Sequence, residues 1–224
     1  MSAMQVTSIV EDPALVQRRR KEIVAAATEL FSKQGFYRTT IKEIAALAGI
    51  SSGLVYQYVR EKDDVLLLVI LDVVEAYARE IPRALEGVED PIERLVTTIG
   101  AYCRVVDKRR AATVLAYRST KSLSPDRRRL IQARELETNE LITAAITECI
   151  KMRLVRRINV DVLTYQIVLI AHGWALKSWY LRSRLSIDQY IRDNLDILLG
   201  AILTRSGQKR YGARRNRRKM PASL

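Results

Sequence analysis

Residues 40–59 read TIKEIAALAGISSGLVYQYV, and this pattern predicts two short helices joined by a tight turn. Thr40 and Glu43 have the spacing of a capping box at the start of the first helix. Gly49 suits the left-handed residue that ends that helix, and Ser51 suits the N-cap of the second. Two capped helices joined by a glycine turn are typical of a helix-turn-helix.

Helical patterns continue on both sides of this motif. Apolar residues recur every three to four positions, proline stands at the first position of several expected helices, and no segment alternates as a strand would. We therefore predict an all-α fold. The expected helices cover residues 13–34, 41–48, 52–58, 62–85, 91–107, 109–122, 125–153, 160–183 and 187–204.

This pattern predicts an N-terminal three-helix domain followed by a larger six-helix domain. The domain that contains the helix-turn-helix is expected over residues 1–61 and the larger domain over 62–205. Residues 206–224 are expected to be a basic, disordered tail. Eight basic and no acidic residues lie between Arg205 and Lys219, and removing them from the net charge of +13 leaves +5. The net charge of the chain is therefore no evidence for what the N-terminal domain binds. That prediction depends on the residues of the motif.

Several function classes lack the residues they need. The sequence contains no glycine-rich phosphate loop, no metal-ligand spacing and no nucleophile–base signature, so we expect neither an enzyme nor a cofactor. Two cysteines are too few for a disulfide framework, and no apolar run reaches the length of a membrane span. We therefore expect a soluble cytoplasmic protein. The single histidine, His172, is predicted to be a core residue.

The second helix of the motif is predicted to present Ser52, Gly53, Tyr56 and Gln57 on its outer face. This face has no acidic residue that would repel phosphates. A glutamine can pair with an adenine edge in the major groove, and a tyrosine can contact a phosphate or a thymine methyl group. Glycine allows a close approach of the backbone to the DNA.

Basic and hydroxyl side chains around this face are expected to hold DNA phosphates. They are Arg18, Arg20, Thr39, Thr40, Ser51, Tyr58 and Lys62. Two alternatives remain open at this point: a three-helix packing unit without a ligand, and a helical protein–protein adaptor that binds nucleic acid non-specifically.

Residues 19–66, RRKEIVAAATELFSKQGFYRTTIKEIAALAGISSGLVYQYVREKDDVL, resemble the N-terminal domain of the TetR/AcrR family. This resemblance implies a dimeric regulator, in most members a repressor, that releases DNA when a small molecule enters its C-terminal domain. Residues 1–61 would then be the helix-turn-helix DNA-binding domain and residues 62–205 the effector-binding and dimerisation domain. Three positions depart from the usual family pattern. Val59 stands where the family usually has phenylalanine, Tyr58 where it often has histidine, and Glu61 where it usually has a capping residue.

Apolar stripes on the last two long helices suggest a four-helix interface between two copies, as the family resemblance implies. The predicted dimerisation residues are Leu163, Ile167, Ile170, Ile191, Leu195, Leu198 and Ile202. Burial within one subunit is the alternative. A homodimer would suit a palindromic site in double-stranded DNA whose half-sites lie one helical turn, about 34–36 Å, apart.

Aromatic and basic residues of the larger domain suggest an apolar tunnel with a basic mouth, suited to an amphipathic anion. The candidate ligand-binding residues are Tyr77, Tyr102, Arg104, Tyr117, Arg118, Lys121, Trp174 and Lys177. The segments LAYRSTKSL and WALKSWYLR also resemble the branch of the family that senses acyl-CoA thioesters, so an acyl-CoA or a related apolar acid is expected as the effector. Alternatively, these aromatics are core residues and the arginines a solvated face, or Asp72 and Glu75 hold a cationic effector.

Overall fold

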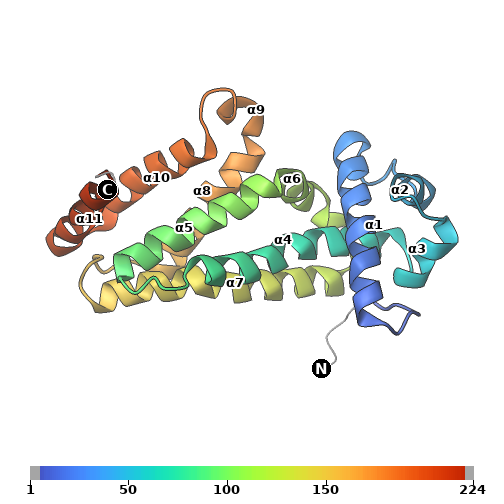
Figure 1. The fold of residues 1–224 in the computed structure, drawn as a ribbon, viewed down its shortest axis with the longest axis horizontal. Coiled ribbons are helices and arrows are strands. Elements are labelled where there is room, and N and C mark those ends of the chain that lie inside the picture. The colour runs from blue at the N-terminus through green and yellow to red at the C-terminus, as the bar shows by residue number, and fades with distance from the viewer. Residues whose placement is uncertain (1–5, 220–224) are drawn as a thin grey trace, which may run out of the picture. The chain divides into compact units, whose positions relative to one another are not determined.

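The computed structural model describes residues 6–219, with side chains described from residue 6 to residue 212. Within that range the chain forms eleven α-helices, one short 3-10 helix and no β-strand, which confirms the predicted all-α fold (Figure 1). In chain order these are α1 (Pro13–Gln34), α2 (Ile41–Leu47), α3 (Ser52–Tyr58), α4 (Lys62–Ala84), α5 (Pro91–Lys108), α6 (Arg110–Ser119), η1 (Thr120–Ser122), α7 (Pro125–Lys151), α8 (Val160–Leu176), α9 (Ser178–Leu181), α10 (Ile187–Ile202) and α11 (Arg205–Lys219).

The described chain packs as two compact units. The first contains residues 6–76 and 109–136, and the second contains residues 77–108 and 137–219. Both α4 and α7 run from one unit into the other. The predicted boundary after residue 61 coincides with the start of α4, but the first unit also includes the first part of α4 and all of α6.

Helices α1, α2 and α3 pack together in the first unit, and α6 packs against α1. The caps expected from the sequence are present: the Thr40 hydroxyl oxygen accepts a hydrogen bond from the Glu43 backbone N–H, and Ser51 caps α3 through the Leu54 N–H. Gly49, between α2 and α3, has φ = 70°, a value that L residues with a side chain rarely adopt. Ile23, Ile44 and Val55 are fully buried where the helices meet.

The starts of α4 and α7 are joined by ion pairs inside the first unit. Asp64 is buried, its carboxylate accepts from the Arg60 backbone N–H at 2.9 Å, and it pairs with Arg127 of α7. Arg127 also lies 2.8 Å from a carboxylate oxygen of Glu61. A buried charge that loses its partner is strongly destabilising, so these contacts hold the start of α4 in place.

In the second unit, α5 packs against α8, α10 and α11 (Figure 1). Trp174 of α8 is buried, and its indole Nε1 donates to Asp107 at 2.8 Å. The Tyr190 hydroxyl of α10 donates to the Ile170 carbonyl at 2.7 Å. These bonds satisfy the polar ends of large side chains whose rings lie inside the unit.

Two elements differ from the sequence-based expectation. The helix predicted over 160–183 is interrupted at Lys177, whose backbone (φ = −113°, ψ = 21°) leaves the helical region between α8 and α9. The stretch expected to be a disordered tail forms α11 as far as Lys219, and residues 220–224 lie outside the described part of the chain.

One tertiary contact and one local contact stabilise α11. Arg210 pairs with Asp90, far away in the sequence, and the Thr204 hydroxyl, directly before the helix, accepts from the Gly207 backbone N–H at 3.1 Å. A Cβ at Gly207 would lie 2.1 Å from the Leu154 carbonyl oxygen, so a glycine is required for this close approach. The basic composition of the segment reveals none of these partners.

Candidate functional site

The outer face of α3 is exposed, as predicted. Tyr56 is 51% exposed, Gln57 and Gly53 are exposed, and Ser52 is half-buried. Helix α3 contains no acidic residue. This surface therefore offers an amide, a phenol and a hydroxyl to a partner without repelling phosphates, which is the chemistry that major-groove recognition uses.

Thr40 and Ser51 are exposed, but their hydroxyl groups already have internal roles. Each oxygen caps a helix, as described above, and the Thr40 hydroxyl also donates to Glu43 at 2.8 Å. Glu43 in turn accepts from the Thr40 backbone N–H, and these bonds lower the pKa of its carboxyl group. A contact of either residue with DNA would compete with helix capping.

Two of the residues predicted to hold phosphates are core residues instead. Thr39 is fully buried and its hydroxyl donates to the Gly35 carbonyl at 2.9 Å. Tyr58 is only 2% exposed because it lies on the inner face of α3, three residues after the buried Val55. Neither side chain can reach a phosphate in this structure, so both assignments are corrected.

Two predicted phosphate-binding cations bind backbone carbonyls of the first unit. The Lys62 Nζ donates to the carbonyls of Phe36 and Thr39, both at 2.9 Å. Arg20 donates to the Val6 carbonyl at 2.6 Å and to the Tyr58 carbonyl at 3.0 Å. Burial lowers the pKa of Arg20. Only Arg18, among the predicted cations here, is exposed and without such a contact in the described chain.

Sequence reasoning missed exposed residues beside the motif. Tyr37 is 80% exposed, and Arg38 and Lys42 are exposed around the start of α2. An aromatic and a basic residue directly before a helix cap were a signal that could have been noticed. The segment before α1 was also missed: the Ser8 hydroxyl and the Ile9 N–H both donate to the Gln57 carbonyl, at the end of α3.

A cluster of aromatic rings occupies the interior of the second unit. The rings of Tyr77 (α4) and Tyr102 (α5) are stacked, with centroids 4.0 Å apart, and the Tyr77 hydroxyl lies 3.3 Å from Nε2 of His172 (α8). All three residues are buried. Burial lowers the pKa of His172 to about 4, so the imidazole is neutral at pH 7. Predicted ligand residues Tyr77 and Tyr102 are therefore neighbours.

Two buried polar side chains of the second unit have no hydrogen-bond partner among the described residues. Both amide atoms of Asn139 (α7) and the hydroxyl of Thr98 (α5) are unpaired. Thr98 lies one helical turn before Tyr102, so both belong to one face of α5. An unpaired buried polar group costs about 1–3 kcal/mol, and a polar ligand group would remove that cost.

The remaining predicted ligand residues are dispersed. Trp174 is buried in the second unit with its indole bonded to Asp107, and Lys177 is exposed at the end of α8. Tyr117, Arg118 and Lys121 are exposed on α6 and η1 of the first unit. Of the carboxylates considered for a cationic effector, Asp72 pairs with Arg109 at 3.0 Å, and Glu75 is exposed.

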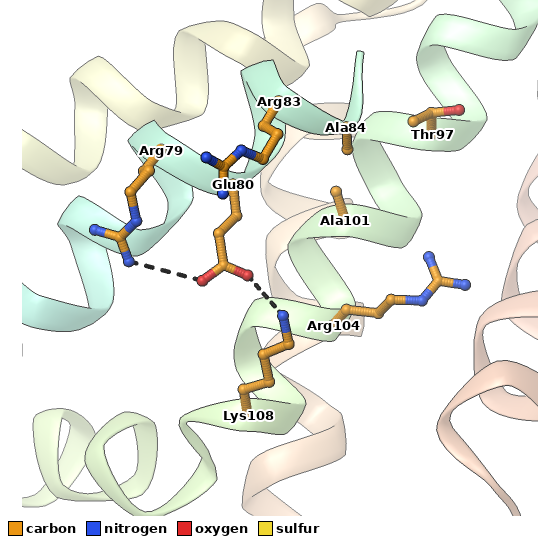
Figure 2. Close-up of a pocket in the computed structure, with 8 residues that line it drawn as sticks. All are labelled: Arg79, Glu80, Arg83, Ala84, Thr97, Ala101, Arg104 and Lys108. Carbon is orange, nitrogen blue, oxygen red and sulfur yellow. Dashed lines mark hydrogen bonds and ion pairs between the residues drawn. The ribbon is translucent and has the colours of Figure 1, made fainter. Parts of the chain in front are cut away.

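A cavity of about 470 Å³ lies between α4 and α5 in the second unit (Figure 2). Its basic side chains are Arg79 and Arg83 of α4 and Arg104 and Lys108 of α5. Glu80 is its single acidic lining residue. The sequence pointed to Arg104, but the two arginines of α4 that share this cavity were missed.

Most of the predicted dimerisation residues are buried in the subunit's own core. Leu163, Ile167, Ile191, Leu195 and Ile202 are buried, and Ile170 and Leu198 are partly buried. A different set of apolar residues is exposed on the same helices and on α9: Val162, Leu169, Trp179 and Ile197. The apolar stripes in the sequence identified the inner faces of α8 and α10.

Within residues 6–219, no helix combines the length and apolar character that crossing a membrane requires. Among the side chains described, those of residues 6–212, no three from His, Cys, Asp or Glu come together in a way that would hold a metal ion.

This chain matches two known families, one over the helix-turn-helix and one over the larger helical region. Residues 23–69 match the family described as bacterial regulatory proteins, tetR family. Residues 88–202 match the family described as tetracyclin repressor-like, C-terminal domain. Together these two matches include α3 and most of the second unit's helices.

Individual relatives agree with both matches. The HTH-type transcriptional regulator HbdR of Aromatoleum sp. (strain CIB) is 49% identical over 207 residues, covering 92% of this chain and 90% of that protein. The structure of the ketosteroid transcriptional regulator KstR2 of Mycobacterium tuberculosis is similar in fold, with a TM-score of 0.69 at 22% identity, covering 89% of this chain and all of that one.

The fold is also similar to that of AibR, solved in complex with isovaleryl coenzyme A and operator DNA. The TM-score is 0.70 at 17% identity, and the match covers 81% of this chain and 98% of that one. Both family matches and the HbdR relative lead to one conclusion. The chain belongs to the TetR family and is a DNA-binding transcriptional regulator rather than an enzyme.

Proposed function

We propose that this regulator binds a palindromic operator in double-stranded DNA as a homodimer, with α3 of each copy in a major groove. The observation that carries the proposal is the exposed face of α3, where Tyr56 and Gln57 are accessible and no acidic residue is present. In this assignment Gln57 reads a base edge, Tyr56 contacts a phosphate or a thymine methyl group, and Gly53 allows close approach.

Phosphate contacts are assigned to the exposed residues around this face. Arg18, Tyr37, Arg38 and Lys42 replace the buried or internally bonded residues in this role. Residues 1–61 then form the DNA-binding domain, and residues 62–205 the effector and dimerisation domain. Because bacterial operator DNA lies in the cytoplasm, the protein is assigned to that compartment.

The dimer interface is assigned to the exposed apolar residues of α8, α9 and α10. Val162 and Leu169 lie seven residues apart, on one face of α8, and Trp179 and Ile197 are 77% and 74% exposed. Large exposed apolar side chains are buried when they lie in an association site, which lowers their free energy. A second copy of the same chain would bury them and place two α3 helices on one operator.

The effector is proposed to be an acyl-CoA or a related apolar acid. In the interior of the second unit, the Tyr77–Tyr102–His172 cluster and the unpaired Asn139 amide supply apolar surface together with a polar partner. Apolar surface combined with a few polar groups is typical of small-molecule sites. AibR, which shares the fold, was solved with isovaleryl coenzyme A, which favours this class of ligand.

Effector binding is proposed to act on DNA affinity through α4. This helix begins with Lys62, which binds the loop before α2, and it also carries Tyr77 of the interior cluster. A ligand that favours a different position of α4 would favour a different position of the DNA-binding domain. We propose release of the operator, and therefore repression in the absence of effector.

The test of DNA binding is a footprint and mobility-shift titration on the DNA upstream of the protein's own gene. A two-fold symmetric footprint is expected. The Gln57→Ala variant should lose discrimination at one base pair in each half-site, by about 1–3 kcal/mol. Met152→Ala, an exposed change in the second unit, is the control. Binding that ignores sequence and disappears with salt would instead favour a helical adaptor with non-specific nucleic-acid binding.

The test of the effector is a thermal-shift screen of acyl-CoA thioesters, free acids and organic cations. A thioester or acid is expected to raise the melting temperature and to release the operator DNA. Stabilisation by cations alone would contradict the assignment.

A further inference from the structure

The cavity between α4 and α5 is lined by four basic side chains and a single acidic one. Arg79 and Arg83 are four residues apart on α4, and Arg104 and Lys108 are four residues apart on α5. This spacing puts both members of each pair on one face of their helix, where like charges repel. The two pairs line the same space of about 470 Å³.

The acidic side chains nearby do not balance these four cations. Glu80 lies 2.9 Å from the Lys108 Nζ and 3.8 Å from an Arg79 guanidinium nitrogen, so it is shared between them (Figure 2). Arg104 pairs with Asp188 of α10 at 2.9 Å. Arg83 makes no hydrogen bond or ion pair with any residue in the described part of the chain. Its guanidinium has its donors available.

Three of the residues that line the cavity have small side chains. Ala84 and Ala101 lie between the arginines of α4 and Arg104, and Thr97 adds a hydroxyl group that can donate a hydrogen bond (Figure 2). Larger residues at the alanine positions would fill this space. A volume near 470 Å³ falls within the range of small-molecule sites.

The guanidinium and ammonium groups of this lining are suited to bind phosphate groups. Guanidinium groups bind phosphate oxygens in pairs of parallel hydrogen bonds, and a lysine supplies a mobile point charge. Two arginines on one side and an arginine and a lysine on the other suit a ligand with more than one phosphate. A monocarboxylic acid would leave most of these donors without a partner.

We propose that this cavity binds the phosphate groups of a nucleotide-bearing effector, with Arg83 as its principal free donor. The identification of that effector as a coenzyme A thioester rests on the function proposed above. The diphosphate and 3′-phosphate of coenzyme A carry the charge that this site lacks. The acyl group, which has no charge, is recognised elsewhere in the second unit.

Because these cations are exposed to solvent, the affinity for such a ligand should depend on ionic strength. The side chains of Arg79, Arg104 and Lys108 are all more than half exposed, so water and salt reach the site. Binding through the phosphates should therefore weaken as ionic strength rises, whereas recognition of a buried acyl group should not.

The experiment measures binding to the full-length protein by isothermal titration calorimetry. The ligands are isovaleryl-CoA, free coenzyme A, ADP and isovaleryl-pantetheine, which lacks all the phosphates. The variants are Arg83→Gln and the double change Arg79→Gln with Arg83→Gln. Arg157→Gln removes an equal charge from an exposed position of the second unit and is the control. Circular dichroism checks that each variant folds.

Arg83→Gln is expected to weaken binding of isovaleryl-CoA, coenzyme A and ADP by about tenfold, and the double variant by more. Binding of isovaleryl-pantetheine, and all binding by Arg157→Gln, should not change. If the Arg83 variants bind the three phosphate-bearing ligands as the wild type does, the proposal is overturned, even where the thioester releases DNA.

Other outcomes separate this proposal from the proposed effector. Arg83-dependent binding of coenzyme A or ADP, without any thioester that releases the operator, would support the phosphate site and contradict the acyl-CoA effector. Absence of binding by all three phosphate-bearing ligands to the wild type would overturn the phosphate site.

Discussion

The Nζ atom of Lys62, at the start of α4, lies 2.9 Å from the carbonyl oxygen of Thr39, just before α2. The same ammonium group donates to the Phe36 carbonyl and lies 4.6 Å from the centre of the Phe36 ring. A lysine that the sequence suggested for a DNA phosphate therefore stabilises the loop that leads into the helix-turn-helix. Its ammonium group is bound to backbone carbonyls of the protein itself.

Replacing Lys62 by methionine tests this role. The variant loses charge-assisted hydrogen bonds, each worth about 1.5–3 kcal/mol, and should unfold at a lower urea concentration. Its affinity for operator DNA should fall, but the dependence of affinity on salt should not change. Lys33→Met removes an exposed lysine that pairs only with Glu29 and should cost little. A salt slope reduced by about one, with unchanged stability, would restore the phosphate contact.

Asn139 provides a test of the interior site. Its amide is buried and unpaired, so Asn139→Leu should stabilise the protein without ligand, by about 1–3 kcal/mol in urea denaturation. The same change should weaken effector binding, because the ligand loses its polar partner. In contrast, Asn194→Leu removes an amide that donates to the Tyr190 carbonyl at 2.8 Å, and it should destabilise. A less stable Asn139→Leu protein would show that the amide has a structural partner.

His172 predicts how stability depends on pH. Burial lowers the pKa of its imidazole from 6.5 to about 4, so between these values the unfolded chain binds a proton that the folded chain does not. Stability should therefore fall as pH decreases from 6.5 toward 4, by up to about 1.4 kcal/mol per pH unit from this group. Above pH 6.5 both states are neutral and this contribution is constant.

The measurement is urea denaturation at several pH values for the wild type and His172→Gln. Because the chain has a single histidine, the difference between the two curves isolates this group. A constant difference over the whole pH range would mean that the histidine titrates normally in the folded protein.

Exposed apolar residues of α8 and α10 predict where the dimer forms. Leu169→Glu and Ile197→Glu place charges in the proposed interface and should yield folded monomers in sedimentation experiments, with weaker operator binding. Met152→Glu changes an exposed apolar residue at another position and should remain dimeric. Dimers that persist in both α8 and α10 variants would place the interface elsewhere.

Local patterns in the sequence were sufficient for the all-α fold class and for the helix-turn-helix, although not for the break at Lys177 or for α11. The capping pair Thr40 and Glu43, the turn at Gly49 and the cap at Ser51 all operate within a few residues of one another, so reading the chain in order reveals them. The exposed Tyr56 and Gln57 follow from the same periodicity, since the buried Val55 sets the orientation of the short helix.

Helical periodicity alone could not distinguish the inner face of a subunit from an interface between subunits. Leu163 and Leu195 were assigned to the dimer because both environments select the same apolar side chains. The exposed residues Leu169 and Ile197 became apparent only when the subunit's own core had been located.

The sequence by itself determined the helices of the motif, their caps and the exposed face of α3, because these depend on residues within one or two turns. Tertiary structure alone decided which charges are free. Lys62 is bound to carbonyls at positions 36 and 39, Arg210 to Asp90, and Arg83 has no such partner among the described residues. These partners are set by how helices pack, and distance along the chain carries no information about them.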